Sequence, residues 1–141
     1  MNPLEPTRIP PAPIPPWPIR VYWEDTDAGG IVFYANYLKY FERARTEWLR
    51  QQGVSQQHLK DTSGLMFVVA QTSIRYLAPA RLDDELQVTT EVIDRGRASM
   101  TLQQQAWRGT TLLCDGTIRI GCVEAASLRP ARMPALPGRT P

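Results

Sequence analysis

Three carboxylates, Glu24, Asp25 and Asp27, are crowded together just before the glycine pair Gly29 and Gly30. Carboxylates serve as nucleophiles or general bases, and glycines let the backbone turn sharply or approach a ligand closely. A helical pattern begins a few residues later, and the free N–H groups of a first helical turn stabilise negative charge. The stretch therefore suits chemistry at a polarised carbonyl, but residue types alone do not choose among the three acids.

The helix that must position these groups is predicted over about residues 35–52. Its apolar stripe recurs at i, i+4, i+7 and i+11 and consists of Tyr37, Phe41, Ala44 and Trp48. Asn36 is a plausible N-cap, with a substrate-positioning role as the alternative, and Gly53 is a plausible C′ terminator. Such an apolar helix has to be covered by other elements, and the rest of the chain offers mostly strands.

Strand patterns flank this helix on both sides. A short strand is expected over 19–23, a polar helical turn over 54–61, and four longer strands over 65–77, 86–94, 98–107 and 111–123. The last two connections, 95–97 and 108–110, are short and contain glycine, as antiparallel hairpins require. The sequence therefore predicts an α+β domain in which one sheet buries one helix.

Length and composition bound the remaining organisation. The 141 residues suffice for one domain, expected over 19–124. The eight prolines of residues 1–18 exclude a helix or a central strand, so this segment is expected to be an extended or disordered arm, and 125–141 a C-terminal tail. The formal net charge of +2 does not favour a nucleic-acid partner.

The two cysteines and the hydropathy pattern point to the cytoplasm. Cys114 and Cys122 share one predicted strand, where eight residues span about 26 Å, so they cannot bridge each other within that strand. No apolar run approaches the roughly 20 residues that a transmembrane segment needs, and prolines interrupt any signal-peptide pattern.

At this point the sequence resembles a known family. The ungapped run from Tyr22 to Glu47 closely resembles the Tol–Pal-associated acyl-CoA thioesterases, a branch of the 4-hydroxybenzoyl-CoA thioesterase family. Residues 73–80 and 128–134 also look like this branch. The resemblance implies the hotdog fold, a five-stranded antiparallel sheet wrapped around one long helix, and hydrolysis of acyl-CoA thioesters without metal or bound cofactor.

The resemblance also assigns site residues. It selects Asp27 as the catalytic acid, acting as nucleophile or as general base, and the Tyr34 backbone N–H as the donor that polarises the thioester carbonyl. Many members of the branch carry histidine at the Tyr34 position, whereas the aryl-CoA enzymes carry tyrosine, as here. Gly30, Asn36 and Tyr37 are candidate substrate-binding residues beside them.

Further expectations concern phosphates and partners. Arg97 resembles, by position, a basic residue that holds coenzyme A phosphates in the aryl-CoA enzymes, with a plain charged hairpin as the alternative. The resemblance implies a homo-oligomer, a dimer or a dimer of dimers (homotetramer), with acyl carrier protein as a possible partner. The competing interpretation is a non-catalytic hotdog protein that binds acyl-CoA or acyl carrier protein and is associated with envelope maintenance.

Overall fold

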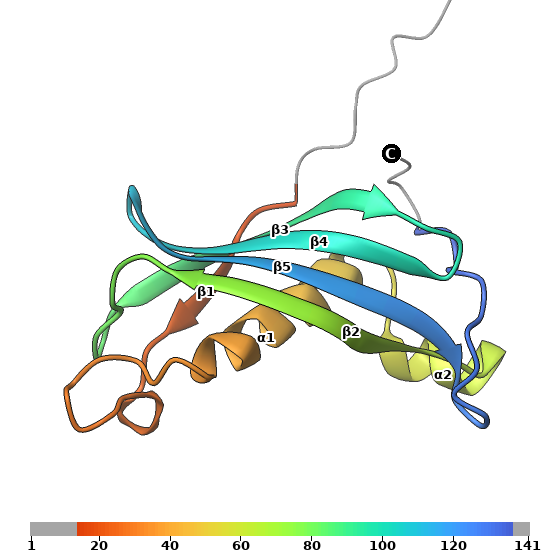
Figure 1. Cartoon of the computed structure of the whole chain (residues 1–141), viewed down its shortest axis with the longest axis horizontal. Coiled ribbons are helices and arrows are strands. Elements are labelled where there is room, and N and C mark those ends of the chain that lie inside the picture. The colour runs from red at the N-terminus through yellow and green to blue at the C-terminus, as the bar shows by residue number, and fades with distance from the viewer. Residues whose placement is uncertain (1–13, 137–141) are drawn as a thin grey trace, which may run out of the picture.

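The chain forms one antiparallel sheet that curls around a long helix, as the computed structural model shows for residues 14–136 (Figure 1). The strands are β1 (Trp17–Arg20), β2 (Leu65–Tyr76), β3 (Glu85–Arg95), β4 (Ser99–Arg108) and β5 (Thr111–Glu124). Their order in the sheet is β1-β3-β4-β5-β2, and every neighbouring pair is antiparallel. The helix α1 (Asn36–Gln51) lies against one face of the sheet, so the predicted α+β hotdog fold is confirmed.

The stripe of α1 forms the core of the domain together with the inner face of the sheet. All four predicted stripe residues are buried. Facing them, the sheet contributes fully buried side chains from β3, β4 and β5, which include Leu86, Leu102, Leu113 and Ile118. Each large apolar side chain removed from water contributes about 1.5–3 kcal/mol, so this contact surface dominates the stability of the domain.

Gly116 marks the closest approach between the sheet and α1. A Cβ atom added at Gly116 would lie 2.7 Å from Cε2 of Phe41, a distance that real Cβ contacts do not reach. Glycine in the middle of β5 therefore lets the Phe41 ring lie directly against the strand backbone.

The two ends of α1 differ from each other in how well the sequence predicted them. Gly53 follows the helix with φ = 80° and donates to the Arg50 carbonyl, so its role as C′ terminator is confirmed. The N-cap prediction for Asn36 is wrong. Ala35 occupies the N-cap position and Asn36 is the first residue of the helix, with its side chain directed to another partner.

The first strand lies earlier in the chain than expected. It covers Trp17–Arg20 rather than 19–23, and Trp23–Asp25 form a short 3-10 helix. Pro18 is accommodated because β1 is an edge strand, paired only with β3, where a missing N–H costs little. The strand thus includes the last residues of the predicted arm, and the first 13 residues of that arm lie outside the described part of the chain.

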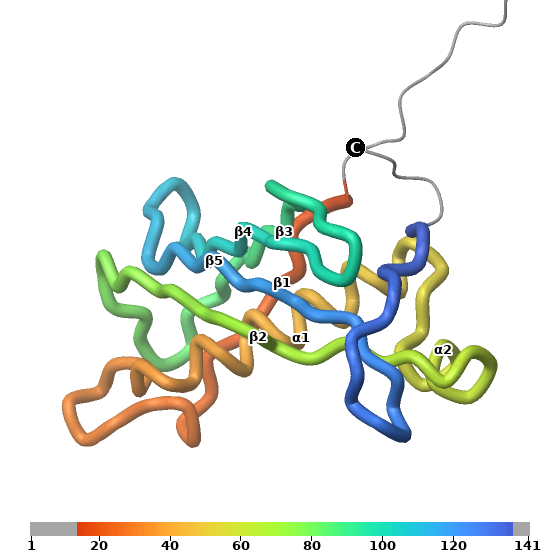
Figure 2. The backbone as a smooth tube through the Cα atoms, turned by 45° about the vertical axis from the view of Figure 1, so that its right-hand side comes forward, coloured from red at the N-terminus to blue at the C-terminus, as the bar shows by residue number. Residues whose placement is uncertain are grey.

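The segment that follows β5 packs back on the sheet over its described length. The Ala131 N–H donates to the Cys122 carbonyl at 2.9 Å, and the Met133 N–H donates to the Arg97 carbonyl at 2.8 Å. Leu136 is buried in the core. Figure 2 shows this segment passing beside the β3–β4 hairpin, at the end of the molecule that also carries α2 (Gln56–Ser63).

Both cysteines are free and buried in β5. Burial raises the pKa of the Cys114 thiol to about 12, with a smaller contribution from the nearby Asp115. Of the helices in residues 14–136, none has the length and apolar character to span a membrane.

Candidate active site

The Asp27 carboxylate is held by one oxygen and free at the other. Its Oδ1 accepts the Gly29 N–H at 2.8 Å, and the Gly30 N–H donates to the Asp27 carbonyl at 3.0 Å. Gly30 has φ = 77°, which glycine adopts without strain. Within residues 14–136, Oδ2 accepts no hydrogen bond, and the side chain is exposed. A carboxylate anchored in this way has one oxygen available to a water molecule or a substrate carbon.

The Tyr34 backbone N–H is the oxyanion donor that the resemblance predicts. It lies two residues before α1, and in the described part of the chain it donates to no acceptor. The Tyr34 carbonyl accepts the Tyr76 hydroxyl at 3.1 Å, and the two rings meet edge to face at 6.1 Å. The peptide of Tyr34 is thus fixed from β2 while its N–H remains available at the positive end of the helix.

Asp25 connects the acidic turn to the start of α1. Its carbonyl oxygen accepts both the Phe33 N–H at 2.9 Å and Nδ2 of Asn36 at 2.8 Å. Its carboxylate accepts the Tyr22 N–H at 2.8 Å and is almost completely buried. Asp25 is therefore a structural acid, a distinction from Asp27 that residue types alone do not reveal. Glu24 is exposed and accepts no hydrogen bond from the described residues.

Tyr37 supports the site from behind. Its ring is buried, packs on Tyr40 and Tyr76, and its hydroxyl accepts the Ala80 N–H at 3.3 Å. Burial raises the pKa of the Tyr37 phenol, although the Ala80 hydrogen bond opposes this. Burial, and next the nearby Asp25 carboxylate, raise the pKa of the Tyr40 phenol. Both phenols are neutral at physiological pH and fill the space under the first turn of α1.

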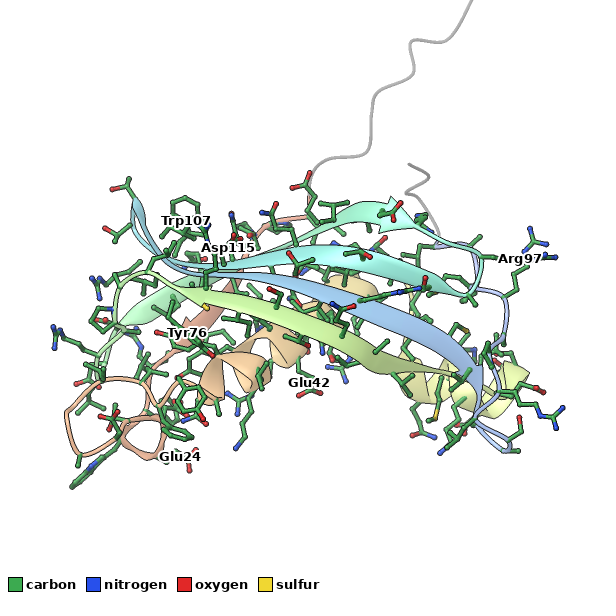
Figure 3. All side chains as sticks on the ribbon, in the orientation of Figure 1. Glu24, Glu42, Tyr76, Arg97, Trp107 and Asp115 are labelled. Atoms are coloured by element: carbon green, nitrogen blue, oxygen red, sulfur yellow. The ribbon has the colours of Figure 1, made fainter. Side chains whose placement is uncertain are left out.

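Arg97 lies at the opposite end of the molecule from this group. Figure 3 shows Glu24 and Tyr76 at one end of the sheet and Arg97 at the other. One copy of the chain therefore brings Asp27, Gly30, Tyr34, Asn36 and Tyr37 together but leaves Arg97 apart.

Arg97 has cationic neighbours of its own. Together with Arg95 and Arg132 it lines a cavity of 530 Å³ beside the β3–β4 turn. None of the three arginines forms an ion pair within residues 14–136. Arg132 was missed by sequence reasoning, because only the packing of the C-terminal segment brings it to this turn.

The site brings two groups that suit carbonyl chemistry to one loop. An exposed carboxylate and a free backbone N–H lie at the two ends of one short loop that is tied together by Asp25. No group of three or more metal-ligating side chains occurs among the described residues. With the curled sheet and central helix, this arrangement defines a hotdog protein of the thioesterase class.

Comparison with known proteins agrees with this class. The sequence profile of the Thioesterase-like superfamily matches residues 21–136. The chain is 44% identical over 118 residues to the acyl-CoA thioesterase YbgC of Haemophilus influenzae. This alignment covers 84% of this chain and 87% of that protein. It is 43% identical over 119 residues to the acyl-CoA thioester hydrolase YbgC of Escherichia coli, covering 84% of this chain and 88% of that protein.

Solved structures show the same relationship. The crystal structure of a probable thioesterase from Bartonella henselae matches with a TM-score of 0.79 and 32% identity, covering 84% of this chain and 97% of that one. The chain belongs to the thioesterase-like superfamily, and the enzyme class predicted from its sequence, a thioesterase, is confirmed.

Proposed function

We propose that this protein hydrolyses acyl-CoA thioesters to a free acid and coenzyme A, with Asp27 and the Tyr34 N–H as its catalytic groups. The proposal is carried by two groups at the two ends of one loop. Among residues 14–136, one carboxylate oxygen of Asp27 accepts no hydrogen bond and the Tyr34 N–H donates none. The names of the YbgC relatives support acyl-CoA as the substrate class.

The reaction needs only these two groups and water. The thioester carbonyl oxygen accepts the Tyr34 N–H, which stabilises the negative charge that develops there. The free oxygen of Asp27 then either attacks the carbonyl carbon, forming a mixed anhydride that water cleaves, or removes a proton from the attacking water. Both routes expel the coenzyme A thiolate, which takes up a proton, and both leave a free carboxylic acid.

The remaining substrate contacts follow from the position of each residue. Gly30 lets the substrate approach the turn, Asn36 holds the loop in place, and Tyr37 sets the position of the first helical turn from below. Arg97, with Arg95 and Arg132, binds the phosphates of coenzyme A. The absence of ion pairs for these three arginines among the described residues supports that role.

A dimer, or a dimer of dimers, would let Arg97 and Asp27 act on one substrate although they lie at opposite ends of a single copy. The strand β2 is an edge of the sheet, and Val69 and Tyr76 on it are about half exposed. Pairing of two β2 edges about a two-fold axis would place the arginine end of one copy beside the catalytic end of the other. A cytoplasmic location is supported by the two free thiols.

The test is hydrolysis of short-chain, long-chain and aryl acyl-CoAs by the purified protein, followed by Asp27→Asn. We expect this substitution to lower kcat by about 10²–10⁴-fold, the usual contribution of a positioned acid or base. Glu24→Gln is the matched control, since Glu24 is an exposed carboxylate near Asp27. Its side chain accepts no hydrogen bond from residues 14–136. An Asp27→Asn enzyme as fast as wild type would refute the role of Asp27. Tight acyl-CoA binding without turnover by wild type would support the non-catalytic alternative.

A further inference from the structure

A second cavity, which the proposed chemistry does not use, lies between α1 and the sheet. It has a volume of 190 Å³ and is bounded by α1, the start of α2, β2, β4 and β5. Its apolar walls include Leu49, Phe67, Met100, Leu102 and Ile120. The polar side chains at its boundary are Glu42, Arg45, Thr46 and Gln56. Its volume is below the roughly 300–1,000 Å³ of a pocket for a whole ligand, so it has room only for the end of one.

Arg45 is the unusual member of this wall. Its side chain is partly buried, and Nη1 donates to Oε1 of Gln104 at 2.9 Å. Gln104 is completely buried, and its Nε2 donates to the Phe41 carbonyl and to Oγ1 of Thr90, each at 2.9 Å. These two hydrogen bonds fix the orientation of the Gln104 amide. The amide oxygen in turn holds one edge of the Arg45 guanidinium group.

Arg45 forms no ion pair in the part of the chain that the structure describes. Its hydrogen-bond partner there is the neutral amide of Gln104. Burial lowers the pKa of the guanidinium below its usual value, and the negative charge of Glu42 opposes that effect. Since an arginine keeps its proton in a protein, a partly desolvated cation remains at the pocket wall.

The remaining donors of Arg45 are suited to an oxygen acid. A guanidinium group carries five N–H donors, which match a carboxylate in a two-point contact. A partly buried cation that forms no ion pair is stabilised by an incoming anion more than a surface arginine is. Resting on the proposed function, we propose that this pocket receives the far end of the acyl group and that Arg45 selects acyl groups ending in a carboxylate.

The position of the pocket fits this role. Arg45 lies nine residues after Asn36 on the same helix, about 14 Å along its axis. Val69, which lies inside the edge strand β2, lines the pocket. Tyr76 ends the same strand, and its hydroxyl donates to the Tyr34 carbonyl. In the proposed dimer, a two-fold axis near the middle of β2 also brings the catalytic end of the second copy beside this pocket.

Glu42 is the one acidic side chain of the pocket wall. It is exposed, and Figure 3 shows it projecting from α1. Water screens its charge, so it weakens the field of Arg45 without cancelling it. Replacing Glu42 by glutamine should therefore strengthen the preference for a carboxylate, while leaving the fold unchanged.

Matched thioesters test the proposal directly. Suberoyl-CoA and dodecanedioyl-CoA are each compared with the thioester in which an isopropyl group, similar in shape, replaces the terminal carboxylate. We expect wild type to favour the carboxylate by about tenfold or more in kcat/KM, the range for a hydrogen bond to a charged group. Arg45→Met should abolish the preference, Arg45→Lys should retain part of it, and Glu42→Gln should increase it.

Arg43→Met is the control, because Arg43 is an exposed arginine of the same helix that does not line the pocket. Equal use of both ends by wild type would overturn the proposal, as would an unchanged preference in a folded Arg45→Met protein. If that variant fails to fold, an unchanged preference in Glu42→Gln would overturn it instead.

Binding separates this inference from the proposed function. Calorimetric titration of Asp27→Asn with both members of each thioester pair measures selectivity without turnover. A carboxylate preference in binding, with no hydrolysis by wild type, would retain the pocket and reject the thioesterase mechanism. Hydrolysis by wild type without any carboxylate preference would reject the role of the pocket and retain the thioesterase mechanism.

Discussion

Nδ2 of Asn36 donates a hydrogen bond to the Asp25 carbonyl across 2.8 Å, joining the first residue of α1 to the acidic turn eleven positions earlier. The same carbonyl also accepts the Phe33 N–H. Because Asp27 follows Asp25 by two residues and Tyr34 follows Phe33 by one, this contact ties together the two groups that we propose as catalytic.

Loss of this contact should lower activity more than stability. For Asn36→Ala we expect a free energy of unfolding lower by about 1 kcal/mol, the usual net contribution of one hydrogen bond. We expect kcat/KM to fall by about 10–100-fold, since a small misplacement of reacting groups is costly. Steady-state kinetics and urea unfolding measure the two effects.

Gln57→Ala is the control for Asn36→Ala, because it removes a 3.0 Å side-chain hydrogen bond to Asp61 on the exposed helix α2. That variant should keep full activity. Equal activity of Asn36→Ala and wild type would show that the loop holds its geometry without Asn36.

The arginine cavity should act on the phosphates of coenzyme A and not on the acyl group. Arg97→Gln and Arg132→Gln should each raise KM for an acyl-CoA by about tenfold, since a hydrogen bond to a charged group contributes about 1.5–3 kcal/mol. Hydrolysis of the matching N-acetylcysteamine thioester, which has no phosphate, should not change.

Arg119→Gln serves as the control for the arginine cavity, because Arg119 is an exposed arginine of β5 outside it. A similar rise in KM for both kinds of thioester in the Arg97 and Arg132 variants would contradict phosphate binding by this cavity.

Gly116→Ala should destabilise the protein through a direct clash. Its new Cβ would lie 2.7 Å from the Phe41 ring, so the helix and β5 must separate. We expect a loss of about 1–3 kcal/mol, the usual cost of overpacking a core. Thermal unfolding measures the loss.

Gly121→Ala is the matched control in the same strand, because its added Cβ would meet Val68 at an ordinary 3.6 Å. The double variant Phe41→Leu with Gly116→Ala should lose less stability than the two single losses combined, since both changes act on one contact. Equal stability of Gly116→Ala and wild type would contradict the close packing described for β5 and α1.

Cys114 should make stability depend on alkaline pH. Its pKa is raised from 9.0 to about 12 by burial, so the unfolded thiol ionises before the folded one does. The stabilisation is complete below pH 9 and is lost as the pH rises toward 12. Cys114→Ala should therefore show a shallower decline of unfolding free energy over this range, measured by urea titration at each pH.

Other groups with raised pKa values contribute in the same direction, namely Tyr37, Tyr40, Tyr76 and Cys122. They remain in both proteins, so the difference between the two slopes reports Cys114. Identical slopes of unfolding free energy against pH in wild type and Cys114→Ala would contradict the burial of the Cys114 thiol. Native Cys114 should also resist alkylation at pH 8, because both its burial and its raised pKa suppress the reactive thiolate.

Local patterns predicted the elements of this fold well where one periodicity prevailed. The stripe of α1 and the glycine at its end follow directly from residue type and spacing, and both are found as expected. The first strand is predicted too late in the chain because Pro18 argues against a central strand, and its position at a sheet edge removes that objection.

The candidate site was harder to derive, because burial depends on tertiary contacts. Asp25 and Asp27 are the same residue type two positions apart, yet one is buried by the start of α1 and the other is exposed. Likewise, Arg132 reaches the Arg97 turn only because the chain after β5 folds back on the sheet. Neither fact has a local signal in the sequence.

The attachment of the segment after β5 to Arg97 has a practical consequence for protein engineering. Leu136 is buried in the core and follows Ala135, which lines the arginine cavity, so a sequence inserted directly after Leu136 is tethered close to these cations. A short tether gives its cargo a millimolar local concentration, about the range for flexible linkers. An acidic tag placed there would act as a built-in competitor of any phosphate ligand, whereas a neutral one would not.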